Sequence, residues 1–107
     1  MSPGPFELSD RIVMVTGAGQ GLGAAIAESM ALHGAHAVLL DIDFDTVSTV
    51  AGQIDAPSST GTAEAVQCDV TDRLQVQQVV EQIHERHGQI DVLVNNAGIH
   101  RLSLIHI

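Results

Sequence analysis

The chain has 107 residues and a formal net charge of −9 at pH 7, with four arginines, no lysine and no tyrosine. Such an acidic surface repels a phosphate backbone, and the apolar runs are too short to cross a bilayer, so we expect neither a nucleic-acid nor a membrane partner. The length predicts one small domain, the lone Cys68 predicts neither a disulfide nor a metal cluster, and the absence of a signal-peptide pattern predicts a cytoplasmic protein.

The first half of the sequence alternates short apolar runs with a stretch of helical period. Residues 11–16 are apolar and β-branched, which predicts a buried strand. A helix is predicted from Gly21 to a C-cap at Gly34. Residues 36–40 predict a second strand, which Asp41 closes. We expect the apolar face of the helix to be formed by Leu22, Ala25, Ile26, Ser29, Met30 and His33.

The same alternation continues in the second half. A second helix is predicted before a surface loop at residues 55–62, and residues 64–70 predict a third strand. Thr71 is expected to be the N-cap of a third helix that ends near His87 and Gly88, before a fourth strand at 91–95. The apolar positions are Phe44, Val47, Val50, Ala51 and Ile54 in the second helix and Val76, Val79, Val80 and Ile83 in the third.

This order of elements indicates an α/β fold. Parallel strands need helical crossovers, and right-handed crossovers leave few topologies, so we expect a Rossmann-type doubly wound parallel sheet with the strand order 3-2-1-4. A complete fold of this type has two such halves. We therefore interpret residues 1–107 as a single, partial dinucleotide-binding domain.

The stretch VTGAGQGLG, residues 15–23, indicates a phosphate-binding turn between the first strand and its helix. Gly17 permits the tight turn, Gly21 lets phosphates approach the backbone, and Gly23 lets the helix pack close to the strands. A Walker loop is excluded, because Leu22 and Gly23 stand where Lys and Ser or Thr would follow.

Asp41 lies 20 positions after Gly21, at the place of a ribose-binding carboxylate. A carboxylate there accepts hydrogen bonds from ribose hydroxyls and repels a 2′-phosphate, and Gln20 offers no charge to hold that phosphate. The sequence therefore favours NAD over NADP. The alternative is that Asp41 only caps a helix.

The motifs TGAGQGLG, CDVTD and NNAG, in this order and spacing, resemble the short-chain dehydrogenase/reductase family over nearly the whole chain. The resemblance implies that residues of the turn wrap the pyrophosphate, that Asp41 holds the adenosine ribose, and that Asp69 and the Val70 backbone meet the adenine. Asparagines of NNAG would line the cofactor or only tie neighbouring strands together, and both readings stay open. The implied residues are Gly17, Gln20, Gly21, Leu22 and Gly23 at the pyrophosphate and Asn95, Ala97 and Gly98 beside the central strand.

The resemblance implies an NAD(P)-dependent oxidoreductase that transfers hydride between the cofactor and a small-molecule alcohol or carbonyl substrate, in a parent protein that is a homo-oligomer. The family uses a tyrosine as acid/base and a lysine that lowers its pKa. Because this chain has neither, no catalytic residue is assigned and the chain alone is expected to be inactive. The alternative is a non-catalytic NAD-binding module with a regulatory or redox-sensing role.

The last residues, 102–107, do not resemble the continuation of the family, and we expect them to be a non-native tail on a truncated chain whose parent is about twice as long. The fourth strand would then present an unpaired apolar edge, which predicts poor solubility.

Two short patterns bear on metal binding, and neither predicts a site. In HERH, residues 84–87, two histidines three positions apart have no apparent third ligand, so we interpret them as a solvated helix face and as partners of the helix dipole. DIDFD, residues 41–45, lacks the later glycine and glutamate of a calcium loop.

Overall fold

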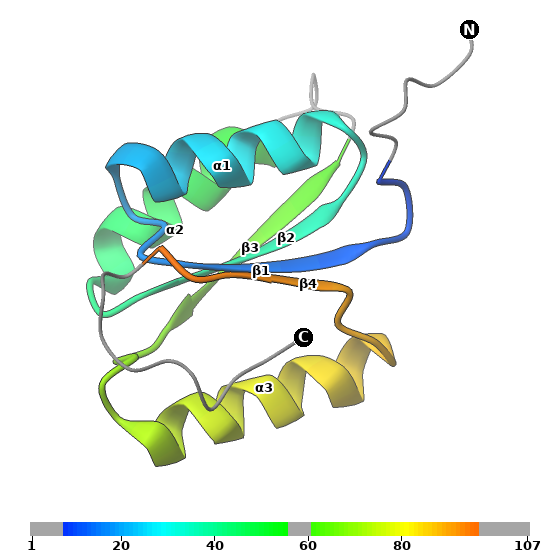
Figure 1. The fold of residues 1–107 in the computed structure, drawn as a ribbon. Helices are drawn as coiled ribbons and strands as arrows, with labels where there is room; N and C mark the ends of the chain where they lie inside the picture. The colour runs from blue at the N-terminus through cyan, green and yellow to red at the C-terminus, as the bar shows by residue number, and fades with distance from the viewer. Residues whose placement is uncertain (1–7, 56–60, 97–107) are drawn as a thin grey trace, which may run out of the picture.

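A computed structural model describes residues 8–55 and 61–96, and the strand and helix order that it gives is the predicted one. The four strands form one parallel sheet in the order β3-β2-β1-β4, which confirms the predicted topology. Figure 1 shows α1 and α2 on one face of this sheet and α3 on the other. The elements are β1 (Ile12–Thr16), α1 (Gly21–Leu32), β2 (His36–Asp41), α2 (Phe44–Ile54), β3 (Thr62–Gln67), α3 (Arg73–His87) and β4 (Val92–Val94).

The apolar runs of β1 and β2 are continuous because helices cover both faces of the sheet. Alternate side chains enter two different cores. Val13 and Leu39 are among those packed with residues of α1 and α2, while Met14 and Val38 are among those packed with residues of α3. Two layers of helix therefore hold the strand ends, where the site lies, from both sides.

The predicted apolar face of α1 is only partly right: Ile26 and Met30 pack against the core, but they are only partly buried. The residues that α1 buries are Gly23, Ala27 and Ala31, whereas Leu22 is 68% exposed. A Cβ added at Gly23 would lie 2.2 Å from the backbone oxygen of Gly17, so the start of α1 lies too close to the glycine turn for a larger side chain at this position. Periodicity favoured the larger apolar residues, but the close approach selects the smallest ones.

The C-cap of α1 lies one residue before the predicted Gly34. The C-cap is His33, and Gly34 follows with a φ of 100°, where its N–H donates to the carbonyl of Ala31 at 2.9 Å. A residue with a side chain would be strained in this conformation.

The predicted apolar stripes of α2 and α3 are largely confirmed. The buried residues are Val47, Ala51 and Ile54 in α2 and Val76, Val79 and Ile83 in α3. Phe44 is the exception, since it is 44% exposed in the first turn of α2.

The N-cap of α3 is Asp72 and not Thr71, because the Asp72 carboxylate accepts the N–H of Gln75 at 3.2 Å. Thr71 instead donates its N–H and its hydroxyl to the carboxylate of Asp69, at 2.9 and 2.6 Å. This local turn also ends β3 earlier than predicted, at Gln67.

β4 is shorter than the predicted strand at 91–95. Asp91 lies before it, and its carboxylate accepts the N–H of Ile12 at 2.8 Å. This hydrogen bond, followed by those from Gln89 and Arg11, lowers the pKa of Asp91 against the opposing effect of burial. In the described part of the chain β4 pairs with β1 alone. No helix among the described residues is long and apolar enough to span a bilayer.

Candidate nucleotide-binding site

The glycine turn lies between the carboxyl end of β1 and the start of α1, as the sequence predicts. Gly17 and Gly21 both have a φ of 62°, which L side chains rarely adopt. The N–H of Ala18 donates to the carbonyl of Leu40 at 3.1 Å, so the turn is fastened to the end of β2. Its course is fixed by backbone contacts and by glycine conformations.

The first turn of α1 has the properties of an anion-binding helix end. Gln20 is its N-cap in an extended conformation, and its side chain makes no capping hydrogen bond. The first turn also contains no acidic residue. Gly21 and Leu22 are exposed there. The amides of this turn and the positive end of the helix dipole are therefore available to a negatively charged group.

Gly23 lies against the start of the turn and against the segment that follows β4. A Cβ there would come within 2.2 Å of the Gly17 oxygen and 2.6 Å of Nδ2 of Asn96. Asn96 itself donates this amide to the Gly17 oxygen at 3.4 Å, and its N–H donates to the hydroxyl of Thr16 at 2.8 Å. The second asparagine of NNAG thus ties the end of β4 to the turn.

Asn95 is exposed, with one long contact of 3.5 Å from the Thr16 hydroxyl to its Oδ1. Its side chain remains accessible to a ligand. The other predicted residues of this motif, Ala97 and Gly98, lie outside the described residues, as does the tail at 102–107. Sequence reasoning missed Thr16, a buried polar residue that joins β1 to the segment after β4.

The carboxylate of Asp41 lies beside the glycine turn. Its Oδ2 accepts the N–H of Gly19 at 2.9 Å, and its Oδ1 accepts the N–H of Asp43 at 3.1 Å. The N-cap of α2 is Asp43, whose side chain accepts the N–H of Thr46. Asp41 therefore does not cap the helix, which removes the alternative reading of this residue.

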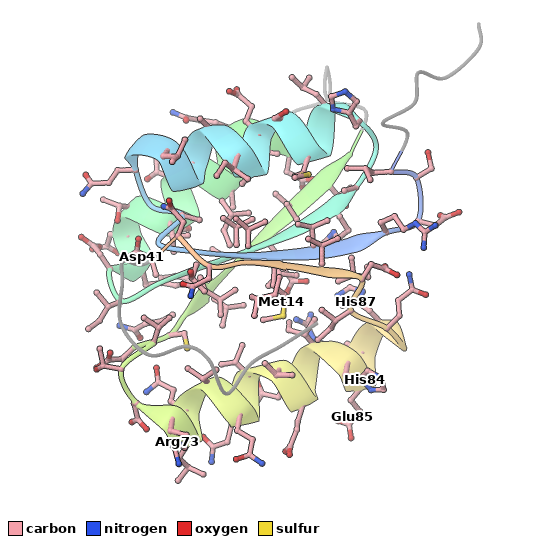
Figure 2. All side chains as sticks on the ribbon, in the orientation of Figure 1. Met14, Asp41, Arg73, His84, Glu85 and His87 are labelled. Carbon is pink, nitrogen blue, oxygen red and sulfur yellow. The ribbon has the colours of Figure 1, made fainter. Side chains whose placement is uncertain are left out.

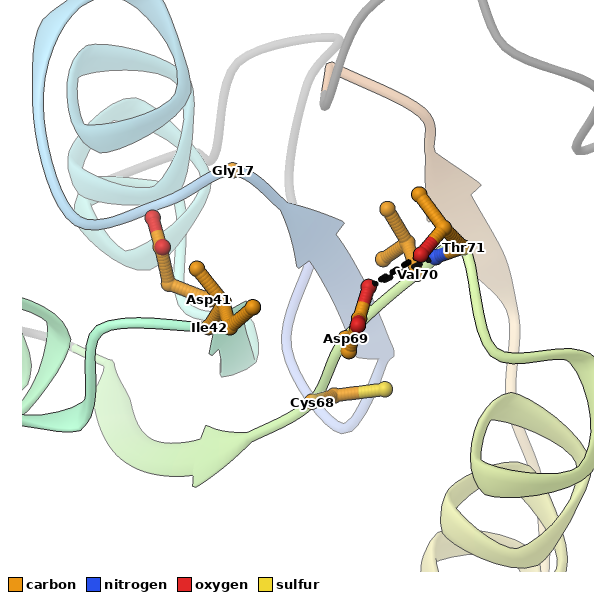
Figure 3. Close-up of a pocket in the computed structure, with 7 residues that line it drawn as sticks. All are labelled: Gly17, Asp41, Ile42, Cys68, Asp69, Val70 and Thr71. Atoms are coloured by element: carbon orange, nitrogen blue, oxygen red, sulfur yellow. Dashed lines mark hydrogen bonds between the residues drawn. The ribbon is translucent and has the colours of Figure 1, made fainter.

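A cavity of about 300 Å³ opens between the glycine turn and the segment that follows β3 (Figure 3). It lies at the carboxyl ends of the first three strands, where open parallel sheets bind their ligands. Asp41 borders it on one side, and Asp69 and Val70 border it on the other. The lining residues are Gly17, Asp41, Ile42, Cys68, Asp69, Val70 and Thr71.

The segment after β3 is held in place by its own hydrogen bonds. Those from the hydroxyl and N–H of Thr71 lower the pKa of Asp69, so this carboxylate is ionised at neutral pH. The N–H of Asp69 donates to Oε1 of Gln75 at 2.6 Å, which fixes the segment to α3. Burial, followed by the charges of Asp69 and Asp72, raises the pKa of the buried Cys68 thiol.

The chain is similar in sequence and in fold to known oxidoreductases. The model of a family described as short chain dehydrogenase matches residues 11–106. Galactitol 2-dehydrogenase of Agrobacterium fabrum is 38% identical over 101 residues, which are 94% of this chain and 38% of that protein. The 15-hydroxyprostaglandin dehydrogenase (NAD(+)) of Rattus norvegicus is 33% identical over 94 residues, which are 88% of this chain and 35% of that protein.

A solved structure gives the same picture. The crystal structure of a metagenomic short-chain oxidoreductase in complex with NADP matches with a TM-score of 0.81 and 36% identity, covering 87% of this chain and 41% of the other. The chain thus spans about two fifths of the length of the relatives that it matches.

Proposed function

Because the chain belongs to the short-chain dehydrogenase family, we propose that it forms the cofactor-binding part of an NAD(P)-dependent oxidoreductase that acts on small-molecule alcohols or carbonyls. The observation that carries this proposal is the uncapped first turn of α1, next to a glycine turn and a cavity of about 300 Å³. The relatives named above are dehydrogenases and oxidoreductases, so they give no support to a non-catalytic regulatory module.

The residues around the cavity fit a dinucleotide. Backbone amides would hold the pyrophosphate, because no basic side chain stands in the turn and a Cβ at Gly23 would fill the space between the turn and α1. Asp41 would hold the adenosine ribose, and Asp69 with the Val70 backbone would meet the adenine. The remaining proposed contacts are Gly17, Gln20, Gly21 and Leu22 at the pyrophosphate and Asn95, Ala97 and Gly98 beside the central strand.

We propose that the preferred cofactor is NAD. Both carboxylate oxygens of Asp41 accept hydrogen bonds from backbone amides, and these bonds fix the side chain at the rim of the cavity. An ionised group there accepts ribose hydroxyls and repels a 2′-phosphate. One relative is named for NAD and one solved neighbour holds NADP, so the relatives favour neither cofactor, and the preference for NAD comes from Asp41.

The nicotinamide, when bound, supplies or accepts the hydride, while this chain binds and orients the cofactor. Tyrosine and lysine are absent from the 107 residues, so we propose that these residues alone are inactive. We further propose that residues 1–107 are one part of a cytoplasmic homo-oligomer with neither a nucleic-acid nor a membrane partner, and that residues 102–107 are a non-native tail.

Calorimetric titration of the 107-residue chain with NADH and with NADPH tests the proposal. NADH is expected to bind more tightly than NADPH. Asp41→Asn is expected to weaken the affinity for NADH roughly ten-fold and to reduce the difference between the affinities for NADH and NADPH. Asp45→Asn is the matched control, because it removes an exposed carboxylate in the first turn of α2. Equal binding of both cofactors by the unaltered chain would contradict the role of Asp41, and no binding of either would contradict the function.

A further inference from the structure

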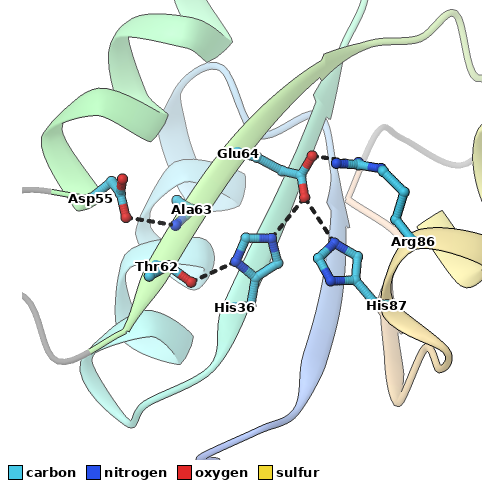
Figure 4. Close-up of polar contacts among 7 residues, drawn as sticks. All are labelled: His36, Asp55, Thr62, Ala63, Glu64, Arg86 and His87. Atoms are coloured by element: carbon cyan, nitrogen blue, oxygen red, sulfur yellow. Dashed lines mark hydrogen bonds and ion pairs between the residues drawn. The ribbon is translucent and has the colours of Figure 1, made fainter. Parts of the chain in front are cut away.

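A cluster of His36, Glu64 and His87 lies at the amino end of the sheet, away from the cavity (Figure 4). Nε2 of His36 lies 2.7 Å from Oε1 of Glu64, and Nε2 of His87 lies 3.1 Å from the same oxygen. The side chains come from the first residue of β2, the middle of β3 and the last residue of α3. Three elements therefore meet at one carboxylate oxygen.

This cluster corrects the sequence interpretation of HERH. His84 is exposed on the outer side of α3, as expected, but His87 is directed at the sheet (Figure 2). The side chain of His87 is 23% exposed, and its ring centroid lies 4.7 Å from that of His36. Its partners are far from it in the sequence, so the spacing of the two histidines in HERH could not reveal them.

We propose that His36, Glu64 and His87 bind one zinc ion or a chemically similar divalent transition metal. Two imidazole nitrogens and one carboxylate oxygen are a ligand set that zinc accepts, with a fourth position left for water. The three donor atoms lie within 4.8 Å of one another. Ligands around tetrahedral zinc lie about 3.4 Å apart, so the contact of 2.7 Å needs to widen by about 0.7 Å and that of 3.1 Å by about 0.3 Å.

The surrounding groups suit this role. Nδ1 of His36 lies 2.5 Å from the hydroxyl of Thr62. Because this hydroxyl can accept a hydrogen bond, the proton of the neutral imidazole can lie on Nδ1, and the lone pair of Nε2 is then free to bind a metal. Arg86 contacts Oε2 of Glu64 at 2.5 Å and leaves Oε1 to the histidines. Metal-bound carboxylates are commonly oriented by such a contact on the second oxygen.

Glu64 is the acidic ligand of the set, and both histidines and Arg86 contact its carboxylate. The net charge of −9 favours a cation over the whole surface.

The cluster is separate from the proposed nucleotide site. His36 and Asp41 are the two ends of β2, a separation of roughly 17 Å for a strand of this length. A metal at the cluster would join the end of α3 to β2 and β3, and would stabilise the domain without contact with the cofactor. Metal binding and cofactor binding can therefore fail independently of each other.

The test uses the tag-free 107-residue chain freed of metal with a chelator. Titration with Co²⁺ is expected to give the visible absorption of a tetrahedral or five-coordinate site, and calorimetry with Zn²⁺ is expected to give one ion per chain. Mg²⁺ and Ca²⁺, which prefer oxygen ligands, are expected not to bind there. Featureless Co²⁺ spectra together with no saturable Zn²⁺ binding would overturn the proposal.

Variants locate the ion. His36→Gln and His87→Gln are each expected to weaken the affinity for Zn²⁺ at least ten-fold. Thr62→Val is expected to weaken it roughly ten-fold, because Thr62 orients the ring of His36. The matched control is His84→Gln, which removes an exposed histidine from the same helix and is expected to leave affinity unchanged. Circular dichroism in metal-free buffer checks that each variant folds. Zn²⁺ affinity that survives in a folded His87→Gln variant would refute the assignment.

Discussion

The N–H of Gly19 donates to Oδ2 of Asp41 at 2.9 Å, so the glycine turn and the acidic residue at the end of β2 determine each other's position. The turn supplies a backbone donor that holds the carboxylate, and the carboxylate in turn fixes the turn. The two motifs of the sequence, 22 residues apart, are therefore one structural unit.

Gly19→Ala is expected to break this unit. The added Cβ would lie 2.8 Å from Oδ2 of Asp41 and 2.8 Å from the hydroxyl of Thr46, so the carboxylate must move. We expect a loss of about 1–3 kcal/mol in unfolding free energy and a roughly ten-fold weaker affinity for NADH, measured by urea unfolding and calorimetry.

The control for this substitution is Gly52→Ala on α2, where a Cβ has nothing within 4 Å. It is expected to stabilise the chain by about 0.5–1 kcal/mol with no change in affinity. An alanine at 19 that bound NADH as well as the unaltered chain would show that Asp41 needs no support from the turn.

Gly23→Ala is expected to be more damaging than Gly19→Ala. Its Cβ would meet the backbone oxygen of Gly17 at 2.2 Å, and backbone cannot rotate away as a side chain can. We expect a loss above roughly 3 kcal/mol, seen as a lower urea midpoint or as failure to fold. Ala25→Gly, at an exposed position of α1, is the control and is expected to cost about 1 kcal/mol. Equal stabilities of the two variants would contradict the close approach of α1 to the turn.

Asp72→Ala is expected to cost about 1 kcal/mol in unfolding free energy, because it removes the side-chain acceptor for the N–H of Gln75. Asp72→Ser keeps an acceptor and is expected to retain most of the stability. Thr71→Ala is expected to cost less than Asp72→Ala, since Thr71 contacts Asp69 and not the helix. Thermal melting of the three variants decides whether Asp72 or Thr71 is the N-cap of α3. A greater loss of stability in Thr71→Ala than in Asp72→Ala would show that Thr71 is the N-cap.

These cases show what the sequence could and could not predict. Strand order and helix positions follow from periodicity, capping residues and the need for crossovers, which are all local signals. The buried face of α1 depends on how near the helix lies to the glycine turn, which is a tertiary property. The choice between Thr71 and Asp72 depends on a local contact of Thr71 with Asp69, two residues away. Hydrophobic patterns encode neither.

The site residues also fall into those that the sequence could predict and those that it could not. The glycine turn and Asp41 stand at recognisable spacings, whereas Thr16 and Asn96 join strands that are distant in the sequence. The sequence left open whether Asp41 caps a helix, and in the structure the N-cap of α2 is Asp43, two residues away.

Glu64→Gln is expected to lower stability in a pH-dependent way. The folded-state pKa of Glu64 is about 2, below its usual 4.5, so its ionised form contributes stability above pH 4.5 that is lost as the pH falls toward 2. The groups responsible are His36 on β2 and Arg86 and His87 on α3. In metal-free buffer we expect a deficit of about 2 kcal/mol at pH 7, measured by urea unfolding.

This deficit should narrow between pH 4.5 and pH 2, because protonation of the unaltered carboxyl makes it resemble the amide. Glu81→Gln, an exposed substitution on α3, is expected to change stability by less than about 0.5 kcal/mol at any pH. A deficit that stayed constant down to pH 2 would mean that Glu64 stabilises the chain through packing. A deficit absent at pH 7 would mean that its three contacts do not outweigh the cost of burying the carboxylate between β3 and α3.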